Sequence, residues 1–151
     1  MPERARTMLD QMQLEAFRQS LPQRERYEVH RFFVVKWDIV AARYFIQQTN
    51  KRLDSMPVAG AARAYNFDKP YVNTIETSSS FALIDPTRAM SEEIDTNVPV
   101  ILALIAREKE GKRPIPLLID GLHRLYKAYR EEKETIPCYA LTPNEEQLCR
   151  L

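Results

Sequence analysis

The sequence predicts a mixed helix-and-sheet domain of the α+β class, and three features of the chain support that prediction. The β-branched, apolar run at 114–119 has the character of a buried strand, bounded by prolines where the chain enters it. After Gly121 the apolar residues change to the spacing of an amphipathic helix. A chain of 151 residues, 44% of them hydrophobic and 28% charged, fits one domain with its own core.

The charge and cysteine content narrow the classes of function. Twenty-two basic and twenty-one acidic residues give a net charge of +1, so no global field draws the chain onto duplex DNA or an anionic membrane. No apolar run approaches the roughly 20 residues that cross a bilayer, and the N-terminus does not resemble a signal peptide. We therefore expect a cytoplasmic protein without a membrane partner. Cys138 and Cys149 are too few for a disulfide framework.

The first 26 residues are expected to form a helical extension of a domain at 27–151. Thr7 and Asp10 have the spacing of a helix-start signal, and apolar residues share one broad face of a helix over 7–20. This helix packs either on the domain or on a second copy of the chain, which would make a homodimer.

Between residues 27 and 84 the spacing of apolar residues first predicts regular secondary structure and then becomes irregular. The run at 27–37 is rich in strand formers and predicts one long strand, with a helix as the alternative. Asp38 is a good N-cap for a helix that continues to about residue 53. Residues 54–80 show no regular pattern and indicate either a functional lid or undetected short strands. We expect short strands at 71–76 and 81–84.

The apolar segment at 98–109 is predicted to be a helix. Asn97 is its expected N-cap, Pro99 is tolerated in its first turn, and Gly111 ends it in the C′ position.

The last third of the chain predicts strand, helix, strand and helix in succession. The strand at 114–119 leads through Gly121 into a helix that runs to about residue 133. A further strand at 134–142 and a short terminal helix at 144–151 follow. The whole chain therefore contains about four or five strands and as many helices.

The corner after residue 119 is the strongest candidate for a functional site. A strand that ends where a helix begins leaves unpaired backbone N–H groups at the corner, with the positive end of the helix dipole behind them. Asp120, Gly121, His123 and Arg124 gather at this point. Such a corner is suited to binding an anion.

Residues 119–125, the following helix with Ala128, and the segment 134–137 with its apolar strand resemble the ParB/sulfiredoxin superfamily. The resemblance extends over 98–142. It implies a small mixed sheet flanked by helices, with a nucleotide-phosphate site at the corner. The nearest branch, which includes free-serine kinases and ParB-like proteins of bacteria, plasmids and phages, carries Asp-Gly-x-His-Arg. The matching residues are Asp120, Gly121, His123 and Arg124.

Leu122 separates this chain from two chemistries of the superfamily. Sulfiredoxins carry a nucleophilic cysteine at this position and ParB partition proteins a glutamate, so sulfinic-acid repair and partition-type CTP switching are disfavoured. The resemblance then implies a nucleotide-binding protein that uses ATP, ADP or CTP with Mg²⁺, as a nucleotidase or phosphotransferase. The alternative is a non-enzymatic ParB-like module that acts through DNA or a protein partner.

Arg124 and His123 have functional and structural interpretations. The forked guanidinium of Arg124 suits a phosphate, whereas the structural alternative is a surface arginine that pairs with a carboxylate on the same helix. His123 hydrogen-bonds a phosphate oxygen or acts as a general acid in the functional interpretation. These two residues and Asp120 are the expected catalytic residues.

The other residues near the corner are expected to support phosphate binding. Asp120 either caps the helix or holds Mg²⁺, and Gly121 provides a positive φ or a close approach to the ligand. Leu122 offers its backbone N–H to the anion while its side chain enters the core. Arg113, after Lys112, reaches the phosphates in one interpretation and lies in a solvated turn in the other.

Overall fold

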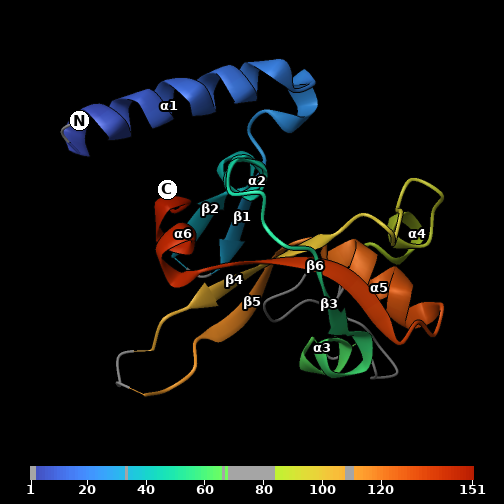
Figure 1. The fold of residues 1–151 in the computed structure, drawn as a ribbon. Helices are drawn as coiled ribbons and strands as arrows, with labels where there is room; N and C mark the ends of the chain where they lie inside the picture. The colour runs from blue at the N-terminus through green and yellow to red at the C-terminus, as the bar shows by residue number, and fades with distance from the viewer. Residues whose placement is uncertain (1–2, 33, 66, 68–83, 108–110) are drawn as a thin grey trace.

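The computed structural model describes residues 3–32, 34–65, 67, 84–107 and 111–151, with the backbone alone at residues 3–10. Its elements follow one another along the chain as a mixture of short helices and strands (Figure 1). In order, they are α1 (Glu3–Ser20), the 3₁₀-helix η1 (Gln23–Glu25), β1 (Val29–Phe32), β2 (Val35–Asp38), α2 (Ile39–Gln48), β3 (Asp54–Pro57), α3 (Val58–Ala64), α4 (Pro86–Ala89), β4 (Val100–Ile105), β5 (Ile115–Asp120), α5 (Leu122–Arg130), β6 (Thr135–Leu141) and α6 (Pro143–Leu148).

A four-stranded mixed sheet organises the fold. Its strand order is β3-β6-β4-β5, in which β4 and β6 run parallel and the other neighbours run antiparallel. A separate antiparallel hairpin is made by β1 and β2. The predicted α+β fold, a small mixed sheet flanked by helices, is confirmed.

Each face of the mixed sheet packs against its own group of helices (Figure 1). On one face, Leu125 of α5 and Val58 of α3 are buried together with Val100 of β4. On the other face, Ala42 of α2 is buried with Ile101 of β4, alongside Trp37 of β2 and Cys149, the residue that follows α6. The strand β4 is therefore covered on both sides.

The helix α1 begins earlier than its sequence signal indicated. It starts at Glu3, so Thr7 lies inside the helix and is not its N-cap. Its C-terminal end is fixed to the domain by Arg18, which donates hydrogen bonds to Asp38 and to the backbone carbonyl of Arg26. Figure 1 shows α1 extending past α2 at the edge of the molecule.

The predicted strand over 27–37 is wrong in its length, because the chain folds back within it. Phe32 of β1 pairs with Val35 of β2, and Val34 between them is 95% exposed. The next prediction is confirmed, since the Asp38 side chain caps α2 by accepting from the N–H groups of Val40 and Ala41.

The helix α2 ends at Gln48, earlier than predicted. Asn50 adopts a positive φ of 47°, a left-handed conformation that an α-helix cannot continue through. The region at 54–80, which showed no pattern, begins with β3 and α3. The predicted strand at 71–76 and residues 81–83 of the next one lie outside the described residues.

The predicted helix over 98–109 is wrong, because Val100–Ile105 forms the strand β4. Asn97 therefore caps no helix, and Gly111 lies in the connection from β4 to β5 with a φ of +78°. The elements after it, β5, α5, β6 and α6, are confirmed with ends shifted by a few residues. None of the described helices has both the length and the apolar character needed to span a membrane.

The C-terminal residues pack against the N-terminal hairpin. Trp37, 1% exposed, donates its indole N–H to the buried carboxylate of Glu146 at 2.8 Å. The backbone N–H groups of Asp38 and Leu151 donate to the carbonyls of Cys149 and Lys36. The end of the chain is thus attached to β2 through both backbone and side chains.

Candidate functional site

The corner between β5 and α5 forms as the sequence predicts, and its geometry requires glycine. Gly121 has a φ of +104°, which L side chains rarely adopt. A Cβ added to it would lie 2.5 Å from Cγ1 of Val100 in β4. Both the backbone conformation and the close approach of β4 therefore exclude a side chain. The predicted positive φ of Gly121 is confirmed.

Asp120 does not cap α5. The N-cap residue is Gly121, which makes no side-chain capping bond. The carboxylate of Asp120 instead accepts from Nη2 of Arg124 at 3.0 Å and from Nη2 of Arg43 at 3.4 Å. Two guanidinium groups from different helices thus meet on one carboxylate oxygen.

Arg124 fastens the segment before β4 to α5. Its Nη1 donates to the backbone carbonyls of Val98 and Pro99, while its Nη2 holds Asp120. Its side chain is 14% exposed. Most of its donors are therefore occupied within the protein. The predicted structural alternative is wrong in its partner, because Asp120 is the last residue of β5 and does not belong to the helix α5.

His123 faces the segment around α4. Its Nε2 accepts a hydrogen bond from the backbone N–H of Asp85 at 3.3 Å. Burial lowers the pKa of His123, nearby Arg88 lowers it further, and Asp85 opposes the shift. The ring is therefore neutral at pH 7 and acts as an acceptor through Nε2.

The other predicted residues divide into those near the corner and those away from it. The side chain of Leu122 packs against the buried cluster under α5, as expected. Arg113 is exposed and precedes β5, whereas Asp120 is the last residue of that strand. At roughly 3.3 Å per residue, the strand separates Arg113 from the corner by about 20 Å. Arg113 and Lys112 therefore lie in a solvated turn.

Residues from the N-terminal half complete the corner, and the sequence interpretation missed them. Arg43 of α2 bonds to Glu28 at 2.9 Å as well as to Asp120. The negative charge of Asp120 also reaches His30 in β1. Burial lowers the pKa of His30, and the charge of Asp120 raises it by a smaller amount. One signal was present in the sequence, since Arg43 is the sole charged residue within α2.

A cavity of about 400 Å³ opens beside these charges. Arg43 and Arg124 supply its positive charges, and Asp120 and Glu25 supply negative ones. Its remaining walls are largely apolar. They are formed by Leu21, Ile46, Val98, Pro99, Ile101 and Tyr139.

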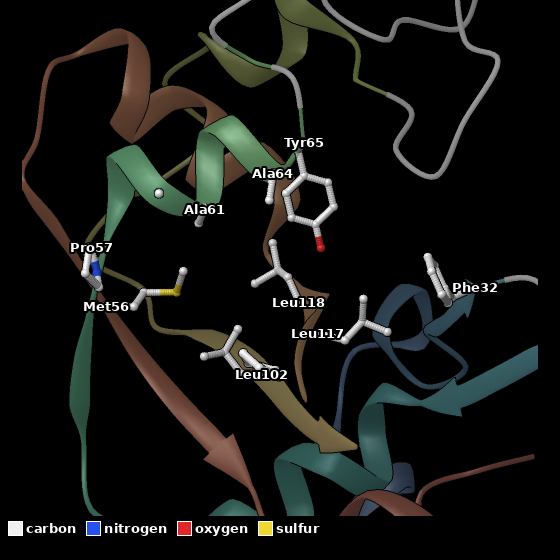
Figure 2. Close-up of a pocket in the computed structure, with 11 residues that line it drawn as sticks. Phe32, Met56, Pro57, Ala61, Ala64, Tyr65, Leu102, Leu117 and Leu118 are labelled. Atoms are coloured by element: carbon white, nitrogen blue, oxygen red, sulfur yellow. The ribbon is translucent and has the colours of Figure 1, made fainter. Parts of the chain in front are cut away.

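A second cavity, of about 540 Å³, lies between α3 and the strands β4 and β5 (Figure 2). Met56, Ala61 and Leu118 are among its walls, and Figure 2 shows the hydroxyl of Tyr65 directed into it. Among the residues that the structure describes, none that lines this cavity is charged. It therefore offers no counter-charge to a phosphate.

The corner does not fit a protein-bound magnesium ion at Asp120. One oxygen of the Asp120 carboxylate, Oδ2, already accepts from two guanidinium groups, and their positive charge opposes a cation beside this carboxylate. Within the described residues, no three His, Cys, Asp or Glu side chains are grouped so that they could hold a metal ion. The predicted metal role of Asp120 is therefore not supported by its surroundings.

Comparison with known proteins found no match to this chain. No protein-family model matches the chain, and neither a curated protein nor a solved structure matches it. The resemblance to the ParB/sulfiredoxin superfamily stays a prediction from the motif at 119–125 and its surroundings.

The two histidines predict how stability depends on pH. Burial lowers the pKa of His30 and of His123 below the ordinary value of 6.5, so the unfolded chain takes up protons first as the pH falls. The contribution of the two histidines to the free energy of unfolding is fully present above about pH 6.5. It decreases as the pH falls toward the pKa values of the two rings in the folded protein.

Urea denaturation at pH 7.5 and pH 5.5 measures this loss for the wild type and for His123→Gln. The variant should lose less stability between the two pH values, because one of the two titrating rings is absent. Equal losses in both proteins would contradict the assignment.

Proposed function

We propose that this protein binds a nucleotide, with the phosphate group at the β5–α5 corner and the rest of the ligand in the 400 Å³ cavity. The observation that carries the proposal is the meeting of Arg43 and Arg124 on one oxygen at the edge of that cavity. Guanidinium groups beside a helix N-terminus favour a phosphate. The apolar wall with Tyr139 and Pro99 suits the base and sugar.

The surroundings of the expected catalytic residues favour binding over phosphoryl transfer. Asp120 is held by two arginines, Arg124 is bonded to backbone carbonyls, and His123 accepts from Asp85. A general base needs a lone pair within hydrogen-bond reach of the proton that it takes, and a metal ligand needs a lone pair directed at the metal. We therefore propose a nucleotide-binding module, and hydrolysis or transfer of phosphate is the second candidate.

Isothermal titration with ATP, ADP and CTP, each with and without Mg²⁺, tests the binding proposal. We expect heat with at least one nucleotide and a dissociation constant in the micromolar range, on the order of −8 kcal/mol in binding free energy. Arg130→Ala is a control, because it removes an exposed arginine at the far end of α5 and should leave nucleotide binding as in the wild type. A folded sample that gives no heat with any of the three nucleotides would overturn the proposal.

The same samples distinguish binding from catalysis. Phosphate release from ATP with Mg²⁺ should stay at the background rate in the wild type. Release above background that is lost in Asp120→Asn would favour the nucleotidase instead.

A further inference from the structure

Arg43 and Arg124 hold the same carboxylate, but Arg43 has more donors left for a ligand. The Nη1 of Arg124 donates to two backbone carbonyls and its Nη2 to Asp120. Within the described residues, the hydrogen bonds of Arg43 use Nη2 alone. Its side chain is 31% exposed, against 14% for Arg124.

The bonds that hold Arg43 are of a kind that a ligand can replace. Glu28, its partner at 2.9 Å, has a side chain that is 41% exposed and can turn into solvent. The contact with Asp120 at 3.4 Å is near the outer limit for a hydrogen bond. If Arg43 leaves, Asp120 keeps its shorter bond to Arg124.

We propose that Arg43 is the residue that contacts the ligand's phosphate, and that Glu28 and Asp120 occupy it in the free protein as internal competitors. The inference rests on the proposed function and names the residue that recognises the phosphate at that same site. A phosphate exchanges places with the two carboxylates on the Arg43 guanidinium. Arg124 acts as a positioning residue, because it holds Asp120 and residues 98–99 in place.

This arrangement predicts opposite effects from neighbouring substitutions. Removing the charge of a competitor frees Arg43, so Asp120→Asn and Glu28→Gln should each tighten binding by about fivefold, as expected for a partly exposed ion pair. Asparagine keeps an oxygen that accepts from Arg124. Removing Arg43 takes away a charge-assisted bond to the phosphate, so Arg43→Gln should weaken binding by about tenfold or more.

Isothermal titration with ADP at constant ionic strength measures all of these proteins, with thermal unfolding to verify that each is folded. Glu131→Gln is the control, because it removes one exposed negative charge at the far end of α5 and should leave the affinity unchanged. Arg43→Lys is a second variant that keeps the charge but loses the fork. Its affinity should fall between those of the wild type and Arg43→Gln.

The outcomes separate this inference from the proposed function. If the wild type binds ADP and Arg43→Gln binds it equally well, the role of Arg43 is overturned while nucleotide binding stands. Weaker binding in Asp120→Asn would show that Asp120 assists the ligand and does not compete with it. If the folded wild type binds none of ATP, ADP and CTP, the proposed function itself fails.

Discussion

Replacing Gly121 by alanine is expected to lower the free energy of unfolding by about 3 kcal/mol, through left-handed backbone strain and overpacking together. The φ of +104° is one that alanine rarely adopts, and the new methyl group would lie 2.5 Å from Cγ1 of Val100. Val100 is fully buried in β4 and cannot move aside without disturbing the sheet. Urea denaturation monitored by circular dichroism measures the loss.

The two other glycines of the chain provide matched controls. Gly111 also has a positive φ but has open space around its Cβ position, so Gly111→Ala isolates the backbone strain and should cost about 1 kcal/mol. Gly60 lies inside α3 with no atom near its Cβ position, so Gly60→Ala should stabilise the protein by up to about 1 kcal/mol. Equal losses in Gly121→Ala and Gly111→Ala would show that contact with Val100 contributes nothing.

Replacing Asp38 by alanine is expected to destabilise the protein by about 4 kcal/mol, because one carboxylate performs two functions. It caps α2, and it pairs with Arg18, whose pKa it raises chiefly through their hydrogen bond. Both residues are 7% exposed. Alanine leaves the α2 N–H groups without an acceptor and leaves the Arg18 charge with the exposed Glu15 as its remaining carboxylate partner.

Two further variants separate these contributions. Asp38→Asn keeps an oxygen for the cap but removes the charge, so its loss should be smaller than that of Asp38→Ala. Glu15→Gln removes the other carboxylate partner of Arg18, which is exposed, and should change stability by less than about 0.5 kcal/mol. An unchanged free energy of unfolding in Asp38→Ala would contradict the proposed attachment of α1.

The segment at 98–109, which was wrongly predicted as a helix, shows where a sequence pattern cannot distinguish a helix from a strand. Val100 and Leu102 pack into the core under α5, whereas Ile101 and Ala103 pack into the core under α2. Successive residues therefore alternate between two faces, but both faces are apolar. A strand buried on both sides has no visible period of two, so the run is indistinguishable from an apolar helix.

The corner itself was predictable because its structure is local. The change of period after Gly121, the need for glycine and the following helix all arise from neighbouring residues. Arg43 could not be placed in the same way, because it is 77 positions from Asp120 along the chain. Its position depends on how α2 packs across the sheet, and a single sequence contains no direct signal for that packing.

The attachment of the C-terminal residues to β2 has a consequence for synthesis on the ribosome. Trp37 and Glu146 are 109 positions apart, so the indole ring emerges long before its partner exists. Chains grow at roughly 5–20 residues per second, which leaves the hairpin without this cover for several seconds or more. During that interval the indole N–H of Trp37 has no Glu146 carboxylate to which it can donate. The fold around it closes only after residues 146–151 have left the exit tunnel.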